Sequence, residues 1–383
     1  MSFKNIVVQL SFFFSYLLGY GQNIPYQKVA ALPQDLKECS GLVALAPNAL
    51  LMINDSGNKP EIFITDTLGN LRLQREIPEL KNIDWEAVTY AKGVLFIGDF
   101  GNNDNKRKDL KIYRLDVSKL LSNGFLKVLA PITFSYANQK SFPPKNANLN
   151  FDMEAMVAKG DSLYLFSKNR TYPFDGKTYG YALPQQAGTY KIEPICFYTT
   201  GQGAMPSFWV ADAAYNQHTK QLALLGYDKL WLLNQVDPTC LLVGEEQKFY
   251  FNQFTQKEAL CWVGNQLFWA DEKNDKKSGF LYKTKANWQV KAGDTIFIQL
   301  LEKDVLNDTV RFNIFSPKES KLKYEVYNTN GVRNPVGRLA LKKGENQLKI
   351  ALNEVPLGSH VVNLIIDGKP HAYFIKKRLN QQP

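Results

Sequence analysis

The chain has 383 residues and a formal net charge of +10, and 13% of its residues are aromatic. This length predicts two domains, at roughly 150 residues for each. The excess positive charge lies mostly in residues 287–383 and forms no basic stripe with interleaved aromatics, which argues against nucleic acid as a partner. The three histidines lie in a predicted loop and in the C-terminal part of the chain. They argue against a histidine-rich zinc site or a Ser-His-Asp triad.

The chain opens with a segment that is typical of a secretory signal peptide. Lys4 supplies a positive charge, an apolar run extends from Ile6 to Leu18, and Gly19-Tyr20-Gly21 supplies small residues for cleavage. The run is too short to span a bilayer, so we expect residues 1–22 to be removed. The mature protein is then secreted or attached to the cell surface. No later stretch reaches the length of a transmembrane helix, and we predict no transmembrane segment.

Five segments that resemble one another follow. Each has an acid within its first three residues, continues with a strand, a turn and a second strand, and then has Asp or a polar substitute; the segments are 37–58, 84–103, 152–169, 210–228 and 257–274. Their first acids are 46 to 68 residues apart, which suits the four-stranded blades of a β-propeller. We predict an all-β protein in which residues 23–286 form a five-bladed propeller, or a six-bladed one if residues 86–154 hide another blade. Residues 25–32 are expected to complete the last blade and close the ring.

The repeated polar residues are expected at one mouth of the central channel, because a hairpin brings the start of its first strand beside the end of its second. One layer contains the acids that begin the repeats: Glu38, Glu86, Glu154, Asp212 and Glu258. A second layer contains the residues that end them: Asp55, Asp99, Asp228, Asp271 and, in the third repeat, Lys168 with Asn169. Asp84 and Asp152 are expected just outside these layers.

Carboxylates that lie within about 4–6 Å of one another repel, and this repulsion favours either protonation or a bound cation. Ca²⁺ prefers several oxygen ligands, and the candidate metal ligands are Glu38, Asp55, Glu86, Asp99, Glu154 and Asp271. The candidate substrate-binding residues are Asn54, Asn102, Lys168, Asn169 and Arg170. In the alternative interpretation the acids are structural, and they tie neighbouring blades together by accepting hydrogen bonds from the backbone.

The cysteines and tryptophans carry weaker signals. Cys39, Cys196, Cys240 and Cys261 lie in apolar strands, at spacings that match no zinc or redox motif. Export permits disulfides, but we expect all four to be small buried apolar residues. Trp85 and Trp262 alternate with the repeat acids, and we expect both to serve packing.

Residues 287–383 are predicted to form a small antiparallel β-sandwich. The segments 320–332, 344–369 and 371–377 place a strand, a glycine-containing turn, further strands and a lysine-rich end in this order. They resemble the C-terminal sorting domain of type IX secretion cargo, which implies the secretion machinery as a partner. The usual Pro-Asn-Pro lead is replaced by "SPKES" (316–320), and a plain immunoglobulin-like module is the alternative.

Five motifs mark residues 36–275: "NDSGN" (54–58), "DWEA" (84–87), "GDFGNN" (98–103), "IYRL" (112–115) and "DMEA" (152–155). Together they resemble a widespread family of exported bacterial propellers of unsettled activity. More distantly the arrangement is similar to esterase-like phytase, gluconolactonase and other calcium-dependent propeller hydrolases. Those proteins place metal and substrate at the channel mouth, which implies the same place for the six candidate ligands.

These observations lead to two functional hypotheses. In the first, the protein is a metal-dependent hydrolase for an ester-like or phosphorylated small molecule, with Ca²⁺ activating a water and a ring carboxylate acting as base. In the second, it is a non-catalytic surface binding module for a glycan, a peptide or a partner protein. A purely scaffolding role is a third alternative. A propeller hosts all of these, so the fold does not choose among them.

Overall fold

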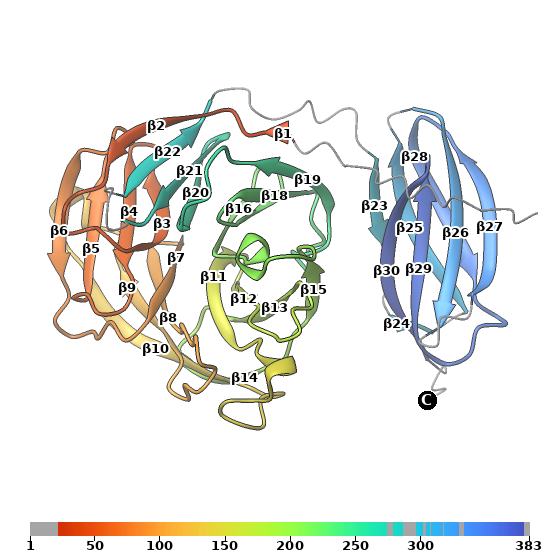
Figure 1. The fold of residues 1–383 in the computed structure, drawn as a ribbon, viewed down its shortest axis with the longest axis horizontal. Helices are drawn as coiled ribbons and strands as arrows, with labels where there is room; N and C mark the ends of the chain where they lie inside the picture. The colour runs from red at the N-terminus through yellow and green to blue at the C-terminus, as the bar shows by residue number, and fades with distance from the viewer. Residues whose placement is uncertain are drawn as a thin grey trace, which may run out of the picture.

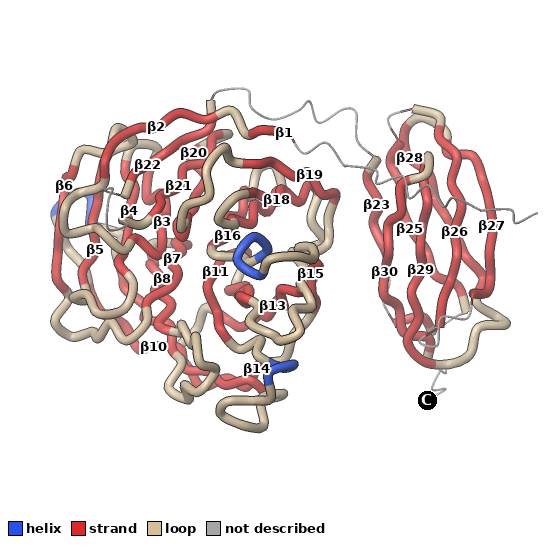
Figure 2. The backbone as a smooth tube through the Cα atoms, viewed as in Figure 1, coloured by secondary structure: helices blue, strands red, loops and turns tan. Residues whose placement is uncertain are grey.

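The computed structural model describes residues 22–273, 279–285, 296–301, 304–306, 308–316, 318–328 and 333–378. The predicted signal peptide lies outside these residues except for Gln22. Nearly all regular elements are strands (Figure 2). Figure 1 shows a ring of sheets formed by β1 to β22 and a separate pair of sheets formed by β23 to β30. No helix within the described residues is long and apolar enough to cross a membrane.

The first two blades follow the first two repeats. Blade 1 contains β3 (Cys39–Ala46), β4 (Ala49–Asn54), β5 (Glu61–Thr65) and β6 (Leu71–Glu76). Blade 2 contains β7 (Trp85–Ala91), β8 (Val94–Asp99), β9 (Lys111–Asp116) and β10 (Lys127–Tyr136). A further strand, β14 (Gly188–Ile192), pairs in parallel with the outer edge of β10. The short helix α1 (Leu120–Asn123) connects β9 to β10.

Blades 3 and 4 follow the next two repeats. Blade 3 contains β11 (Asp152–Lys159), β12 (Ser162–Lys168), β13 (Lys177–Pro184) and β15 (Cys196–Thr199). Blade 4 contains β16 (Asp212–Asn216), β17 (Gln221–Leu225), β18 (Lys229–Asn234) and β19 (Glu245–Tyr250), with β1 (Gln22–Asn23) parallel to β19. Two 3₁₀ helices, η1 (Asn146–Asn148) and η2 (Met205–Phe208), precede β11 and β16.

Blade 5 is completed by the N-terminal strand, as predicted. It contains β20 (Lys257–Val263), β21 (Gln266–Asp271), β22 (Phe280–Thr284) and the outer strand β2 (Tyr26–Ala31). The pairing of β2 with β22 is antiparallel and runs from Tyr26–Thr284 to Ala31–Phe280. The innermost strands β3, β7, β11, β16 and β20 contact one another in a closed circle. The described residues 22–285 therefore form a five-bladed propeller without a sixth blade.

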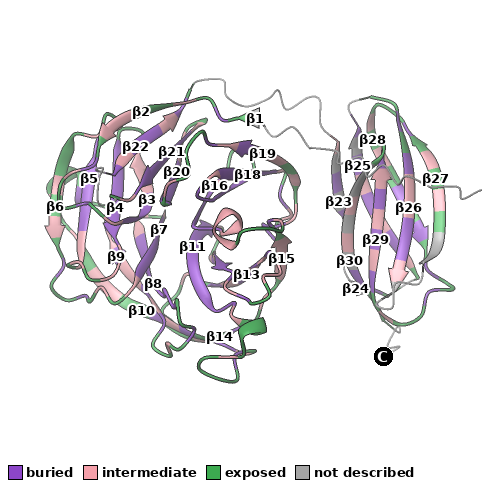
Figure 3. Cartoon of the chain, in the orientation of Figure 1, coloured by how far each residue is buried: buried purple, intermediate pink, exposed green. Residues whose placement is uncertain are grey.

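The core of the propeller consists of five apolar layers, one between each pair of neighbouring blades. Phe96 and Leu165, for example, belong to the layer between blades 2 and 3. Strands between two layers are apolar on both faces, and every residue of β4, "ALLMIN", is buried. Figure 3 shows the same burial along β11 and β16. Each large side chain buried in this way contributes about 1.5–3 kcal/mol, so the layers hold the ring together.

Two cysteines differ from expectation. Cys196 of blade 3 and Cys240 of blade 4 form a disulfide across a sequence separation of 44. The expectation that all four cysteines are unpaired buried residues is wrong for this pair and holds for Cys39 and Cys261, which are free and buried. The spacing gave no signal, because the two cysteines meet only when their blades pack side by side.

The C-terminal strands form two packed sheets. One contains β23 (Phe297–Leu300), β25 (Thr309–Ser316) and β28 (Gly344–Ala351). The other contains β24 (Asp304–Val305), β30 (Lys369–Lys377), β29 (Gly358–Ile366), β26 (Ser320–Asn328) and β27 (Arg333–Leu341). All pairings are antiparallel except that of β24 with β30. A single apolar cluster lies between the sheets, as in a β-sandwich.

Candidate functional site

The residues that begin and end the repeats meet at one end of the blades, which we call the channel mouth. The strand registers pair Trp85 with Asp99, Asp152 with Lys168, and Lys257 with Asp271. In each blade the start of the innermost strand therefore lies beside the end of the second strand. This is the arrangement that the repeat pattern predicts.

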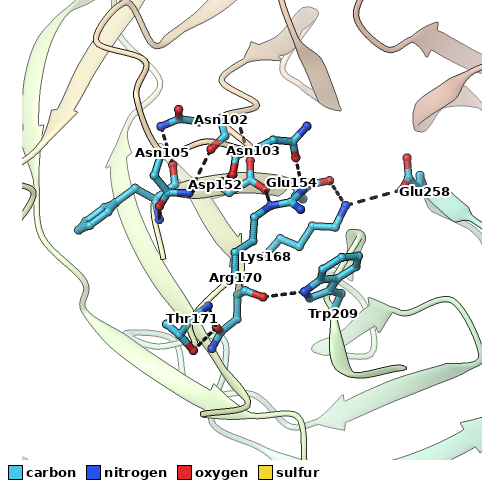
Figure 4. A network of polar contacts seen from close by, with 12 residues as sticks. Asn102, Asn103, Asn105, Asp152, Glu154, Lys168, Arg170, Thr171, Trp209 and Glu258 are labelled. Atoms are coloured by element: carbon cyan, nitrogen blue, oxygen red, sulfur yellow. Dashed lines mark hydrogen bonds and ion pairs between the residues drawn. The ribbon is translucent and has the colours of Figure 1, made fainter. Parts of the chain in front are cut away.

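Lys168 lies at the centre of the mouth. Its Nζ is 3.0 Å from Glu154 Oε2 and 3.7 Å from Glu258 Oε1, and its side chain is 6% exposed. Figure 4 shows the side chain extending between these two glutamates, beside Trp209. Burial lowers the pKa of Lys168, but Glu154 and Glu258 outweigh it and raise the pKa well above its usual value. Lys168 is therefore a fixed positive charge.

Arg170 lies beside Lys168, shares Glu154 with it and also contacts Asp152 (Figure 4). Its Nε donates to Asp152, and its Nη2 is 3.6 Å from Glu154 Oε1. The guanidinium lies over the ring of Trp209, 5.1 Å from the ring centroid, a stacking geometry that arginine favours. Glu154 is thus paired with two basic side chains, Lys168 and Arg170.

Glu258 and Glu272 form an acid pair on the other side of Lys168. The side chain of Glu272 hydrogen-bonds Glu258, and the hydroxyl of Tyr227 donates to Glu258 Oε1. Burial and the negative charge of Glu258 raise the pKa of Glu272 to about 10. Burial opposes ionisation of Glu258, but Lys168 and Tyr227 lower its pKa. At neutral pH the proton of the pair is therefore on Glu272.

Asp55, Asp84 and Glu86 form an acidic triad. One carboxylate oxygen from each lies within 4.8 Å of the other two. Burial and the neighbouring carboxylates raise the pKa of Asp55 to about 6 and the pKa of Glu86 well above its usual value. Glu86 is 4% exposed, and within the described residues no hydrogen bond reaches its carboxylate. The surrounding protein compensates the triad only in part. The N–H of Ser56 donates to Asp55, and the positive charges of Lys168 and Arg107 lower the pKa values of Glu86 and Asp84, but burial outweighs them.

Gly101 makes the close approach within this triad geometrically feasible. A Cβ atom at position 101 would lie 2.5 Å from Asp84 Oδ2 and 2.5 Å from Glu86 Oε1. These distances are shorter than any normal contact, so a side chain at position 101 would push the two carboxylates out of their present positions. The glycine of the "FGNN" turn thus serves the geometry of the mouth as well as that of the turn.

The remaining predicted metal ligands have other partners. Glu38 accepts a hydrogen bond from Asn58. Asp99 accepts hydrogen bonds from the backbone N–H of Asp84 and from Arg107. Asp271 accepts from the N–H of Phe280 and the hydroxyl of Tyr282. The structure therefore places these three acids in hydrogen bonds that support the blades, and we leave them out of the candidate site.

The predicted asparagines also hold the backbone. The Nδ2 groups of Asn54, Asn102 and Asn169 donate to the carbonyls of Asp35, Phe151 and Lys177, respectively. Asp212 fits the structural interpretation, because its Oδ2 accepts the N–H of Leu260 at 2.6 Å and joins blade 4 to blade 5. Asp228 pairs with Lys229 at 2.6 Å.

The structure adds residues that the repeat pattern did not select. Glu272 directly follows Asp271, the acid that the pattern selects in the fifth segment, and Tyr227 and Trp209 lie outside the acid positions that the pattern compares. Trp209 is fixed by a 2.6 Å hydrogen bond from its Nε1 to the carbonyl of Asn169. Trp85 and Trp262 are structural as expected, since their indole N–H groups donate to the carbonyls of Lys81 and Ala214.

Comparisons with known proteins give limited information. No family model and no curated protein matches the chain. Among solved structures, the WD40 β-propeller domain of Doa1 is similar over 70% of this chain and 100% of that chain, with 8% sequence identity and a TM-score of 0.35. The assignment of the fold rests on the blades themselves, and the comparison contributes nothing on activity.

Proposed function

We propose that the channel mouth holds Ca²⁺ between Asp55, Asp84 and Glu86, and that the protein is an exported metal-dependent hydrolase. Its proposed substrate is an ester-like or phosphorylated small molecule. The observation that carries this proposal is the cluster of three carboxylate oxygens within 4.8 Å of one another. Glu86 brings its charge into a buried position, where only a cation or a proton stabilises it.

The donor set fits a hard divalent cation. All three donors are carboxylate oxygens, which Ca²⁺ binds at about 2.3–2.6 Å. Two oxygens on opposite sides of such an ion are about 5 Å apart, and the triad oxygens lie within that limit. The raised pKa values of Asp55 and Glu86 have the same origin as cation affinity, namely carboxylates that repel one another in a buried place.

The chain's own residues would complete a hydrolytic site. A bound divalent cation polarises an ester or phosphoryl oxygen and lowers the pKa of a bound water. Glu272 holds a proton on its carboxyl group beside Glu258, and this group is the proposed proton donor to a leaving oxygen. Lys168 keeps Glu258 ionised, so that Glu258 accepts the hydrogen bond from Glu272. Arg170, stacked on Trp209, is the proposed contact for a negative substrate group.

Export and surface attachment are part of the proposal. The Cys196–Cys240 disulfide supports an oxidising compartment. The antiparallel sandwich of β23 to β30 supports a sorting-like role for the C-terminal segment, with the secretion machinery as its partner.

One observation favours the second candidate function, a non-catalytic binding module. Phe254 is 57% exposed, and its ring packs edge-on against Tyr227 with 5.8 Å between the centroids. Tyr227 in turn packs against Trp209 at 6.0 Å. An exposed aromatic ring that is linked by ring contacts to the polar residues of the channel mouth suits the binding of a glycan or a peptide without any reaction.

Calorimetric titration of the full mature chain with CaCl₂ after chelation tests the metal site. We expect one binding event and a higher melting temperature, both lost in Glu86→Gln and Asp84→Asn. The matched control is Asp161→Asn, because Asp161 is exposed and pairs with Lys92, which is exposed too. If wild-type protein shows neither heat nor a melting shift, the metal site is wrong.

Turnover separates the two functions. Calcium-dependent hydrolysis of p-nitrophenyl phosphate, p-nitrophenyl acetate or a sugar lactone supports the hydrolase. Calcium binding without turnover of any of these substrates, together with glycan or peptide binding that Phe254→Ala weakens, supports the binding module instead.

A further inference from the structure

A second cavity lies away from the acidic triad, where the segment 137–151 covers the side of blade 3. Its volume is about 480 Å³, which is within the usual range for small-molecule sites. The segment leaves β10 and includes η1, the short helix beside β14 in Figures 1 and 2. Figure 3 shows η1 fully exposed. The floor of the cavity is formed by Phe151 and by Tyr179 and Tyr181 of β13.

The covering segment is fixed to the propeller at several points. The backbone N–H groups of Arg170 and Tyr172 donate to the carbonyls of Leu149 and Asn146 at 2.9 and 3.0 Å. Near the start of the segment, Gln139 Nε2 donates to the carbonyl of Asn105 at 2.9 Å. The wall of the cavity is therefore held in place by backbone contacts from blades 2 and 3, as a preformed site requires.

The lining combines aromatic, amide and basic groups. Asn138, Asn148 and Asn150 contribute amides, and Lys140 and Lys145 contribute positive charge. The lining residues, all of them within the described part of the chain, include no carboxylate. This cavity is therefore opposite in charge to the channel mouth, and it favours a ligand with a negative group.

Asn150 gives the independent sign of a ligand. The residue is 8% exposed and lines the cavity, and its buried Oδ1 has no hydrogen-bond partner among the described residues. A buried amide oxygen without a partner costs about 1–3 kcal/mol. Because protein atoms enclose this oxygen, the Asn150 side chain must rotate toward the cavity before a ligand hydroxyl supplies the missing donor. Tyr181, by contrast, is satisfied by a side-chain hydrogen bond with Asn138.

We propose that this cavity binds a sugar that carries a carboxylate or a phosphate group. The half-buried ring of Tyr179 offers a face for the C–H groups of a sugar ring. The Asn150 amide oxygen accepts a hydrogen bond from a sugar hydroxyl. Lys145 receives the negative group, since no ion pair occupies it within the described residues. Lys140 donates to the carbonyl of Ala137 at 2.6 Å and adds positive charge nearby. The inference does not depend on the metal site at the channel mouth.

Calorimetry of the full mature chain with four probes tests the proposal: glucuronic acid, glucose 6-phosphate, glucose and inorganic phosphate. We expect glucuronic acid or glucose 6-phosphate to bind, with the stronger of the two identifying the charged group, and glucose and phosphate alone to bind at least about tenfold more weakly. Lys145→Gln and Tyr179→Ala should each weaken the binding of the preferred probe by about tenfold. Chelation of calcium should leave it unchanged.

The control variant is Lys127→Gln, because Lys127 is an exposed lysine at the start of β10 and does not line the cavity. Melting curves of all three variants confirm that they fold. The proposal is overturned if neither charged sugar binds, or if glucose or inorganic phosphate binds as tightly as the charged sugars. It is also overturned if Lys127→Gln weakens binding as much as Lys145→Gln does.

Discussion

Gly101 lies directly against two carboxylates of the acidic triad. We expect Gly101→Ala to destabilise the protein by about 1–3 kcal/mol, because its Cβ would lie 2.5 Å from oxygens of Asp84 and Glu86. The same change should abolish calcium binding. Urea unfolding with chelator and calorimetry with CaCl₂ measure the two effects.

Gly160→Ala is the control for this prediction. Gly160 has a φ of +61°, and a Cβ there would meet nothing within 4 Å. We expect it to cost about 1 kcal/mol through the left-handed backbone and to leave calcium affinity unchanged. Calcium binding by Gly101→Ala at wild-type affinity would contradict the proposed geometry.

Asp55 should make stability depend on pH in a way that calcium reverses. Its pKa is raised from 3.8 to about 6, so between these values the folded state binds more protons than the unfolded state. Stability therefore falls as pH rises through this window and stays lower above it. In chelator at pH 7 we expect Asp55→Asn to stabilise the protein by about 2 kcal/mol, an effect that shrinks as pH falls toward 4.

In saturating calcium the same variant should be less stable than wild type, because it has lost a ligand. Urea midpoints at pH 4 to 8, with chelator and with calcium, measure both effects, and Asp161→Asn should show neither. An Asp55→Asn variant that is destabilised in chelator would show that the hydrogen bond from the Ser56 N–H to the carboxylate outweighs the cost of burying the charge.

The residues of the site were predictable in part. The repeat pattern pointed to Asp55, Glu86 and Glu154, because these positions recur at the same place in each hairpin. It passed over Glu272, since β21 ends at Asp271 and the chain then leaves the regular pleat that fixes side-chain direction. It also grouped Asp99 with Asp55, although Arg107 pairs with Asp99 from a loop position that no repeat predicts.

At the level of elements, the hairpins and the closing strand followed from alternation and turn residues, whereas β1 and β14 did not. These two strands pair in parallel with β19 and β10, and such edge additions depend on how blades lie in space. Both strands are short, and no pattern in their sequences predicts which strand they pair with.

Removal of residues 23–31 from the mature chain tests the closing strand. The deletion removes β2 and the buried Ile24 and leaves the edge of β22 unpaired, which favours association between chains. We expect a loss of at least about 3 kcal/mol and oligomers in size-exclusion chromatography. A chain that ends at Arg378 serves as the control. A monomeric deletion variant with wild-type stability would show that the ring does not need this strand.

At the scale of the whole molecule, the Cys196–Cys240 disulfide joins two blades that are already neighbours in the ring. Its closed loop predicts that reduction costs about 2–4 kcal/mol. Urea unfolding with and without dithiothreitol measures this difference in wild type. The Cys196→Ser/Cys240→Ser variant should have the stability of reduced wild type, both with and without dithiothreitol. A wild-type midpoint that does not move on reduction would contradict the prediction.

The central claim is that the closed ring gathers Asp55, Asp84 and Glu86 into a cation site. The most direct measurement is a crystal structure of the mature protein grown with calcium and a second crystal soaked with manganese, which is located by its anomalous signal. We predict one ion bound by oxygens of these three residues, with Gly101 packed behind Asp84 and Glu86. A mouth without a bound ion in both crystals, or an ion bound elsewhere while the triad stays vacant, would contradict the account.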